Sequence, residues 1–245
     1  MGVVGGIGSG KSAVSAVLAE FGAFVIDADK VGHALLNQPP VLDRLLERFG
    51  RVILAPVEET EGRETVDRKA LGAIVFSDPK ALRDLESILH PRMRQTFEKA
   101  IARTIRRGEA KAVVLDAAIL YEAGWDSLCD RVLFVDTPKS VRVERLRESR
   151  GWSEEAVTRR ESSQWPLDRK RQQAEWVVSN EGDLDALKSA VAQAWSKVLA
   201  SAPPRLRGPS RPRIADDSQV GEPRREPGGG HPPRGKIWRP RRPPR

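Results

Sequence analysis

Eight residues near the start of the chain, Gly5 to Ser12, restrict the possible folds more than any other segment. They read Gly-Gly-Ile-Gly-Ser-Gly-Lys-Ser and fill every position of the pattern G-x-x-x-x-G-K-[ST]. In such a loop, backbone N–H groups surround phosphate oxygens at the positive end of the helix that follows. Residues 13–20 have helical apolar spacing, and residues 1–4 remain for the preceding strand. The segment therefore predicts a nucleoside triphosphate site; the alternative is an ordinary glycine-rich turn.

Within this P-loop each side chain has an expected role. Lys11 is expected to reach the β- and γ-phosphates of ATP, and the hydroxyl of Ser12 to bind Mg²⁺. The predicted nucleotide-binding residues are Gly8, Ser9, Gly10, Lys11, Ser12 and Ala13.

The positive charge of the chain is concentrated at its C-terminal end. Residues 201–245 contain 12 Lys and Arg against 4 Asp and Glu, which accounts for the whole net charge of +8. This segment also holds 11 of the 18 prolines and few large apolar residues. Because it cannot bury enough apolar surface to offset the entropy of ordering, it is predicted to be a disordered tail. A solvated extension is the favoured interpretation, with weak nucleic-acid binding as the alternative.

Other features of the composition exclude several classes of protein. The single cysteine, Cys129, excludes an intramolecular disulfide and is typical of a reducing compartment. The sequence has no apolar run of about 20 residues and no export-type leader. A cytoplasmic protein without a membrane partner, either a monomer or a small homo-oligomer, is expected.

Short apolar runs alternate with helical stretches along residues 1–200, which predicts an α/β fold. The expected core is a three-layer P-loop domain with a mostly parallel, five-stranded sheet. Its predicted strands are Val3-Val4 and residues 23–26, 112–115, 131–135 and 175–178.

A helical insertion is predicted between the second and third strands, over residues 40–108. Its expected helices cover residues 41–49, 68–76 and 79–107. On a P-loop core, such an insertion is expected to hold the second substrate.

Acidic residues follow several of the predicted strands. Asp27 and Asp29 follow the second strand, Asp116 the third and Asp136 the fourth. In an open parallel sheet, ligands collect outside the carboxyl ends of the strands. Asp116 is therefore a candidate Mg²⁺ carboxylate; the alternative is a helix N-cap or turn residue.

A helical lid is predicted at about residues 151–170. Helices are expected over 138–150 and 153–164, with Gly151 between them and Ser153 as a helix start. The arginines of this region include Arg142, Arg145, Arg147, Arg159 and Arg160. For each arginine taken alone, a solvent-exposed position without a role is the favoured interpretation. For the group as a whole, we expect one arginine to stabilise the phosphoryl group during its transfer.

Taken together, these motifs resemble those of the dephospho-CoA kinase family. The most specific are Asp27-Ala28-Asp29 and Leu89-His90-Pro91, and the resemblance covers most of residues 2–199. Further matching positions are Arg48-Phe49-Gly50, Asp67-Arg68, Leu71, Val75, Phe76, Leu120-Tyr121-Glu122, Val135-Asp136, Gln164, Pro166, Lys170, Asn180 and Gly182.

The resemblance implies transfer of the ATP γ-phosphoryl group to the ribose 3′-hydroxyl of dephospho-CoA, giving coenzyme A. It implies that Asp29 accepts the hydroxyl proton and that Arg145 is the lid arginine. It also implies that Arg68 and His90 bind the acceptor. For His90 the alternative is that the Leu-His-Pro step only separates two helices.

The chain departs from the family pattern in front of the P-loop. Members usually have a longer first strand that ends in Thr, where this chain has Val4. We therefore expect the true start codon to lie upstream. Pro and Thr of the family pattern are also replaced, by Ala118 and Ala13.

Two other functions are compatible with parts of this pattern. A different small-molecule or nucleotide kinase would share the P-loop core and differ in its acceptor. A nucleotide-dependent switch is less compatible, because the sequence lacks an Asn-Lys-x-Asp motif and has an arginine-rich lid.

Overall fold

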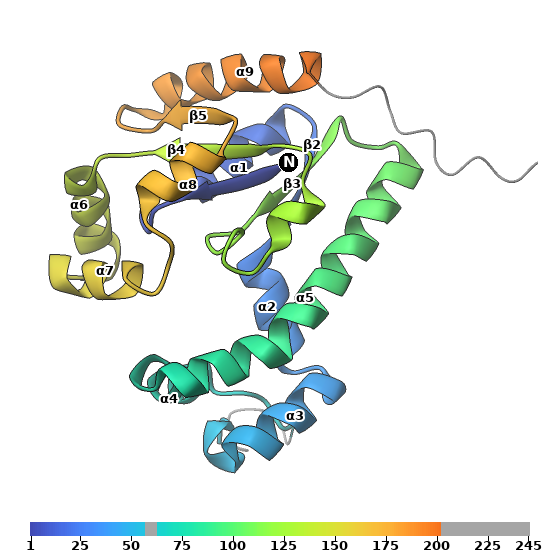
Figure 1. The fold of residues 1–245 in the computed structure, drawn as a ribbon, viewed down its shortest axis with the longest axis vertical. Helices are drawn as coiled ribbons and strands as arrows, with labels where there is room; N and C mark the ends of the chain where they lie inside the picture. Colours follow the sequence, from blue (N-terminus) through green and yellow to red (C-terminus); the bar gives the residue numbers. More distant parts are fainter. Residues whose placement is uncertain (57–62, 202–245) are drawn as a thin grey trace, which may run out of the picture. The chain divides into compact units, whose positions relative to one another are not determined.

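The computed structural model describes residues 1–56 and 63–201, and these contain a five-stranded parallel sheet (Figure 1). The strand order is β2-β3-β1-β4-β5, and every pairing is parallel. The strands are β1 (Gly2–Gly5), β2 (Ala23–Asp27), β3 (Ala112–Asp116), β4 (Val132–Asp136) and β5 (Trp176–Ser179). The predicted fold class and the five predicted strands are confirmed.

The central strand β1 is short but fully buried. Its side chains alternate between two apolar clusters, because successive residues of a strand face opposite sides of the sheet. Val3 belongs to the cluster beneath α1 (Lys11–Glu20) and α9 (Leu184–Ala200). Val4 belongs to the cluster on the other face, beneath α2 (Ala28–Leu36) and α5 (Pro79–Arg107). A strand buried on both faces explains the continuous apolar run in the sequence.

The helices between β2 and β3 form a third apolar cluster away from the sheet. It joins α3 (Pro39–Phe49), η1 (Arg51–Ile53), α4 (Arg68–Ser77) and the first turns of α5. The three helices predicted in this region are present, and α3 begins two residues earlier than predicted because Pro39 occupies its first turn. The short helix α2 was not predicted.

Helix α5 passes through Pro91 without a break. It spans 29 residues, from Pro79 to Arg107, and connects the third cluster to the edge of the sheet (Figure 1). The alternative in which the Leu-His-Pro step separates two helices is therefore wrong. Buried Ile88, Met93 and Phe97 on both sides of the proline anchor the helix to two clusters.

Helices α6 (Lys139–Arg150) and α7 (Glu154–Glu161) are joined by a sharp turn at Gly151. This glycine has φ 64°, a left-handed conformation that suits glycine, and its N–H donates to the carbonyl of Arg147 at 2.9 Å. Ser153 begins α7 by accepting from the N–H of Ala156 at 3.2 Å, as predicted. Helix α7 ends three residues earlier than predicted, and α8 (Leu167–Gln173) and α9 were not predicted.

The predicted tail, apart from Ser201, lies outside the described residues. None of the helices within 1–56 and 63–201 is long and apolar enough to cross a membrane.

Candidate active site

The P-loop joins β1 to α1 at the carboxyl edge of the sheet. Gly8 and Gly10 have φ of 78° and 83°, which side-chain-bearing residues rarely adopt. A Cβ at Gly5 would lie 2.8 Å from the carbonyl oxygen of Val135, and one at Gly10 would lie 2.1 Å from Nδ2 of Asn180. Glycine is thus required both by backbone conformation and by close neighbours. Gly10 supplies no side-chain cap, and its carbonyl accepts from the N–H groups of Ala13 at 3.0 Å and Val14 at 3.1 Å, so the N–H groups of Lys11 and Ser12 are the candidates for binding a ligand at the start of α1.

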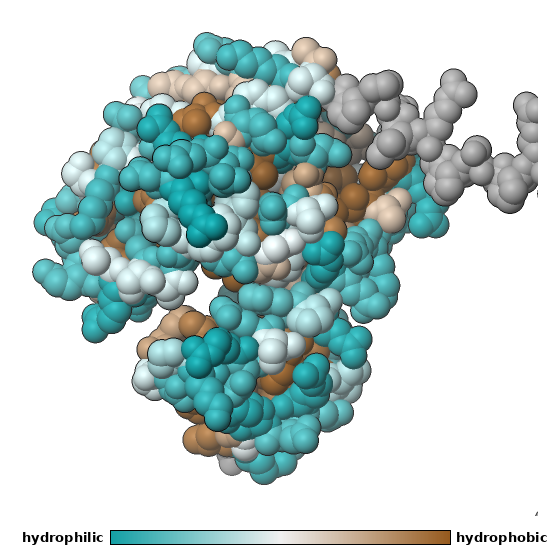
Figure 2. All heavy atoms as spheres, viewed as in Figure 1, coloured by the Kyte–Doolittle hydropathy of each residue, from teal (hydrophilic) through white to brown (hydrophobic). Residues whose placement is uncertain are grey.

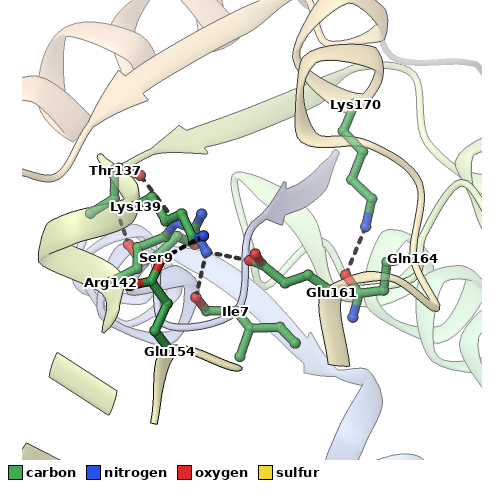
Figure 3. A network of polar contacts seen from close by, with 9 residues as sticks. All are labelled: Ile7, Ser9, Thr137, Lys139, Arg142, Glu154, Glu161, Gln164 and Lys170. Carbon is green, nitrogen blue, oxygen red and sulfur yellow. Dashed lines mark hydrogen bonds and ion pairs between the residues drawn. The ribbon is translucent and has the colours of Figure 1, made fainter. Parts of the chain in front are cut away.

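Three side chains donate hydrogen bonds to backbone carbonyl groups of the P-loop. Nδ2 of Asn180 donates to the carbonyl of Ser9 at 2.8 Å, and Oγ1 of Thr137 donates to the same carbonyl at 3.0 Å. Nη1 of Arg142 donates to the carbonyl of Ile7 at 3.0 Å (Figure 3). Fixing the carbonyls in this way fixes the direction of the N–H groups that would bind phosphate. The sequence pattern gave no sign of this role for Thr137.

Lys11 begins α1 and lies in a mixed electrostatic environment. Burial lowers the pKa of Lys11, and the nearby charges of Asp116 and Asp29 partly oppose that effect. Lys170 and Arg142 act in the same direction as burial. An added anion, such as a triphosphate, would therefore stabilise the ammonium form. Ser12 and Ala13, the next two residues, are exposed.

The predicted acidic residues meet at the carboxyl ends of β2 and β3. Asp27 and Asp116 are direct partners in the parallel register. Burial raises the pKa of Asp116, while a hydrogen bond from Ser15 and the charge of Lys11 lower it. Oγ of Ser15 donates to Oδ2 of Asp116 at 2.9 Å. Asp116 thus faces the P-loop helix, and it caps none of the described helices, so the N-cap alternative is wrong.

Asp29 lies in the first turn of α2, and Asp27 caps that helix. Oδ1 of Asp27 accepts from the N–H of Lys30 at 3.0 Å, which explains why the helix begins directly after the strand. Asp29 is exposed, and its charge acts on both Lys11 and Asp116. The two residues of the Asp-x-Asp pair thus differ: Asp27 caps the helix, and Asp29 has an exposed side chain in its first turn.

His33 follows Asp29 by one helical turn and joins the site to the helical insertion. Nη1 of Arg68 lies 3.1 Å from Nδ1 of His33. Both residues line a hollow of about 490 Å³ that also includes Asp67 and Lys69. Arg68 is the residue that the resemblance assigns to acceptor binding. His33 was not predicted, because its i, i+4 spacing from Asp29 is recognisable only once α2 is assigned.

His90 lies in the middle of α5, beside Trp125. The two rings meet edge to face with centroids 5.1 Å apart. Burial lowers the pKa of His90, so its neutral form is favoured. Within the described residues no hydrogen bond joins His90 to Arg68 or to Asp29, and its predicted part in acceptor binding stays a prediction.

The predicted arginines lie in different environments. Arg142 is 3% exposed, so a solvated position is wrong for this residue. Nη1 of Arg145 would lie 3.8 Å from a Cβ at Gly10, directly beside the P-loop. Arg160 covers the ring of Trp152 at 3.9 Å from the centroid. Arg147 is exposed and pairs with Glu144 on its own helix. Of these residues, Arg145 has the best position to reach a bound phosphate.

A buried lysine on α8 completes the edge of the site. Lys170 is fully buried, and its ammonium group contacts the carbonyl of Ala118 at 2.7 Å, Oε1 of Gln164 at 3.0 Å and Oε1 of Glu122 at 2.8 Å. The same carboxylate oxygen of Glu122 accepts from the N–H of Trp165 at 2.7 Å. These contacts tie the segment after β3 to the start of α8.

Asp27 and Asp116 place two carboxyl groups at the ends of neighbouring strands. In residues 1–56 and 63–201, no three His, Cys, Asp or Glu side chains lie close enough to form a metal site of their own. One or two carboxylates together with phosphate oxygens are a common arrangement for Mg²⁺. Asp116, with Asp27 beside it and the Ser12 hydroxyl on the P-loop, fits that donor set.

The surface of the molecule is hollowed next to this site. In Figure 2 the hollow separates the part that carries α6 and α7 from the part that carries α3 and α4. Much of the face shown is hydrophilic.

Comparison with known proteins gave consistent matches. A family model described as dephospho-CoA kinase matches residues 1–186. The dephospho-CoA kinase of Chlorobaculum tepidum is 38% identical over 200 residues, covering 81% of this chain and 94% of that protein. The dephospho-CoA kinase of Symbiobacterium thermophilum is 40% identical over 196 residues, covering 80% of this chain and 79% of that protein.

Solved structures agree with the sequence matches. The crystal structure of TT1252 from Thermus thermophilus is similar with a TM-score of 0.66 and 34% identity, covering 80% of this chain and 96% of that chain. Dephospho-CoA kinase from Campylobacter jejuni has a TM-score of 0.60 at 23% identity, covering 81% of this chain and 96% of that chain, and supports the fold alone.

Proposed function

The chain belongs to the dephospho-CoA kinase family, whose members use ATP to phosphorylate dephospho-CoA in the last step of coenzyme A synthesis, and we propose that the transfer takes place between the P-loop and Asp29. The γ-phosphoryl group of ATP passes to the ribose 3′-hydroxyl of dephospho-CoA. The observation that carries this proposal is the position of Asp29, an exposed carboxylate in the first turn of α2 whose charge acts on Lys11.

In the proposed mechanism the protein mainly orients the two substrates and stabilises the negative charge on the transferred phosphoryl group. The N–H groups of residues 8–13 and the ammonium group of Lys11 bind the triphosphate. Asp29 accepts the proton of the attacking hydroxyl as the bond to phosphorus forms and the bond to the leaving ADP oxygen breaks. Arg145, from beside Gly10, stabilises the negative charge on the transferred group.

Mg²⁺ is proposed as the cofactor at this site. The Ser12 hydroxyl and Asp116 would hold it, with Asp27 next to Asp116 in the register. When bound, the ion neutralises charge on the β- and γ-phosphate oxygens. Ser15 orients Asp116 through its 2.9 Å hydrogen bond, which favours the ionised carboxylate against the effect of burial on its pKa.

The acceptor is proposed to bind along α2 and the helical insertion, over residues 40–108. His33 and Arg68 present nitrogen atoms to the hollow beside α4. His90 lies on α5, the helix against which α2 packs through contact between Gly32 and Met93. Arg68 and His90 are assigned to acceptor binding, with His33 supporting Arg68.

The catalytic unit is proposed to be residues 1–200, with a lid at about residues 151–170 and residues 201–245 outside the machinery. Deleting residues 202–245 should leave both substrate binding and turnover unchanged. A shorter chain that no longer turns over would contradict this division.

Replacing Asp29 by Asn tests the proposed mechanism. The variant should lose a factor of about 100 to 10,000 in kcat, the usual contribution of general acid–base catalysis, while the KM for ATP changes little. Asp185→Asn is a matched control, because Asp185 also stands two residues after a capping aspartate in the first turn of a helix, α9. Equal losses in the two variants, or a loss that is confined to ATP binding, would contradict the role of Asp29.

A further inference from the structure

Arg142 occupies an unusual position for an arginine, since it is buried behind the phosphate-binding loop. It lies on α6 and its side chain is 4% exposed. Nε donates to the carbonyl of Thr137 at 3.1 Å, and Nη1 donates to the carbonyl of Ile7 at 3.0 Å. A Cβ at Gly6 would lie 2.8 Å from Nη1 of Arg142. The guanidinium group therefore fills the space beneath the loop that the glycine leaves.

The counter-ion of this buried arginine comes from a different helix. Nη1 also donates to Oε1 of Glu161, the last residue of α7, whose side chain is 20% exposed (Figure 3). A buried guanidinium that loses its carboxylate is strongly destabilised, so Arg142 depends on Glu161 for its charge balance. Because the guanidinium is planar and carries several N–H donors, one side chain can hold the carbonyl of Ile7 and the carboxylate of Glu161 in fixed directions.

The ion pair at the other end of α7 is exposed to solvent. Glu154, its first residue, pairs with Lys139 at 2.7 Å, and the two side chains are 58% and 50% exposed. Exposed ion pairs of this kind contribute little to stability. Of the two ion pairs that α7 makes to α6 in the part of the chain that the structure describes, the one at Glu161 involves a buried group that contacts the P-loop.

We propose that Arg142 is a positioning residue that links the lid helix α7 to the P-loop: Glu161 fixes the guanidinium, and the guanidinium fixes the carbonyl of Ile7 and hence the orientation of the phosphate-binding N–H groups. This inference rests on the proposed role of the P-loop in binding ATP. Movement of α7 that separates Glu161 from Arg142 loosens the loop, so nucleotide affinity follows the position of the lid.

The test measures the dissociation constant of ADP by calorimetry on full-length protein, without acceptor. Glu161→Ala should weaken ADP binding by about tenfold, within the range of coupling between residues in contact. Glu154→Ala, at the other end of the same helix, should stay within about twofold. The effect of Glu161→Ala should largely disappear in an Arg142→Gln background, because the link is already broken there.

Two results would overturn the proposal. If Glu161→Ala lowers the melting temperature and leaves ADP affinity unchanged, the pair only stabilises the fold. If it weakens ADP binding equally in both backgrounds, Glu161 acts by another route. Should Arg142→Gln fail to fold, Arg142→Lys keeps the charge beside Glu161 but loses the fork; it should also weaken ADP binding, and unchanged binding would equally count against the link.

Because this readout needs neither dephospho-CoA nor turnover, it is separate from the choice of acceptor. A chain that binds ADP as expected but does not phosphorylate dephospho-CoA would contradict the proposed function alone. The KM for dephospho-CoA in Glu161→Ala should stay within about twofold of the original, since acceptor residues lie on α2, α4 and α5.

Discussion

Ser15 on α1 donates a 2.9 Å hydrogen bond to Oδ2 of Asp116 at the end of β3. The bond joins the P-loop helix to the carboxylate that is proposed to hold Mg²⁺. It opposes the effect of burial, which raises the pKa of Asp116. A hydroxyl one helical turn after Lys11 thus favours the ionised form of this carboxylate and fixes its orientation.

Ser15→Ala should lower kcat/KM for Mg-ATP by about fivefold, the value of one ordinary hydrogen bond of about 1 kcal/mol. Ser15→Thr should recover most of this loss by replacing the hydroxyl. Ser196→Ala on α9, which removes a bond to the carbonyl of Ala192, should have no kinetic effect. Steady-state kinetics at varied Mg-ATP checks this, and an inactive Ser15→Thr would argue against the hydroxyl as the cause.

Lys11→Ala should weaken ADP binding and lower turnover together, because the ammonium group is proposed to bind phosphates in both the ground state and the transition state. The loss in kcat/KM should be on the order of 100-fold. Lys11→Arg keeps the charge and should retain part of the binding. A variant that loses kcat alone, with nucleotide affinity unchanged, would show that Lys11 acts only in the transfer step.

Arg145→Ala should lower kcat by at least about 100-fold, the cost of removing one donor that stabilises transition-state charge. Arg147→Ala is its control on the same helix, since Arg147 is 68% exposed and pairs with Glu144. Single-turnover rates at saturating ATP separate the chemical step from binding. Similar rates for the two variants would remove Arg145 from the proposed mechanism.

Lys170→Met should reduce the free energy of unfolding by about 3–5 kcal/mol, because it leaves the carboxylate of Glu122 without its buried partner. The double variant Lys170→Met, Glu122→Gln should be more stable than the single variant. Lys188→Met, which breaks an exposed pair with Glu20, should change stability by less than about 1 kcal/mol. Urea unfolding measures all of these, and equal losses at Lys170 and Lys188 would contradict a structural role for the buried pair.

Cys129 should react slowly with alkylating reagents near neutral pH. Burial raises the pKa of this thiol to about 11, and neighbouring carboxylates add to that effect. Since the thiolate is the reactive form, the alkylation rate should still be rising above pH 9. A rate that levels off near pH 8.5 would show an ordinary, accessible thiol.

Much of the fold and of the P-loop side of the site could be predicted, because they depend on local signals. Glycines at fixed spacing and apolar runs that end in aspartate identify the loop, the strands and the carboxyl edge of the sheet. The short helix α2 carries no long periodic pattern, so local sequence placed the Asp-x-Asp pair only at the end of a strand, and the role of Asp29 came from the family resemblance. His33 was missed for the same reason.

The buried charged residues could not be predicted from local sequence. Lys and Arg normally indicate exposed positions, and only long-range contacts reverse that rule. Arg142 is buried because Ile7 and Glu161 converge on it, and Lys170 because Ala118 and Glu122 do. Each of these partners lies between 19 and 135 residues away in the chain, so only the folded structure brings them together.

The most direct test of the account measures ADP production by the purified chain with Mg-ATP, with and without dephospho-CoA, together with the mass of the acceptor product. The account predicts that ADP forms only when dephospho-CoA is present, that the product is one phosphoryl group heavier, and that EDTA stops the reaction. Folded protein that binds ADP but leaves dephospho-CoA unmodified, while phosphorylating AMP, CMP or adenosine, would contradict it.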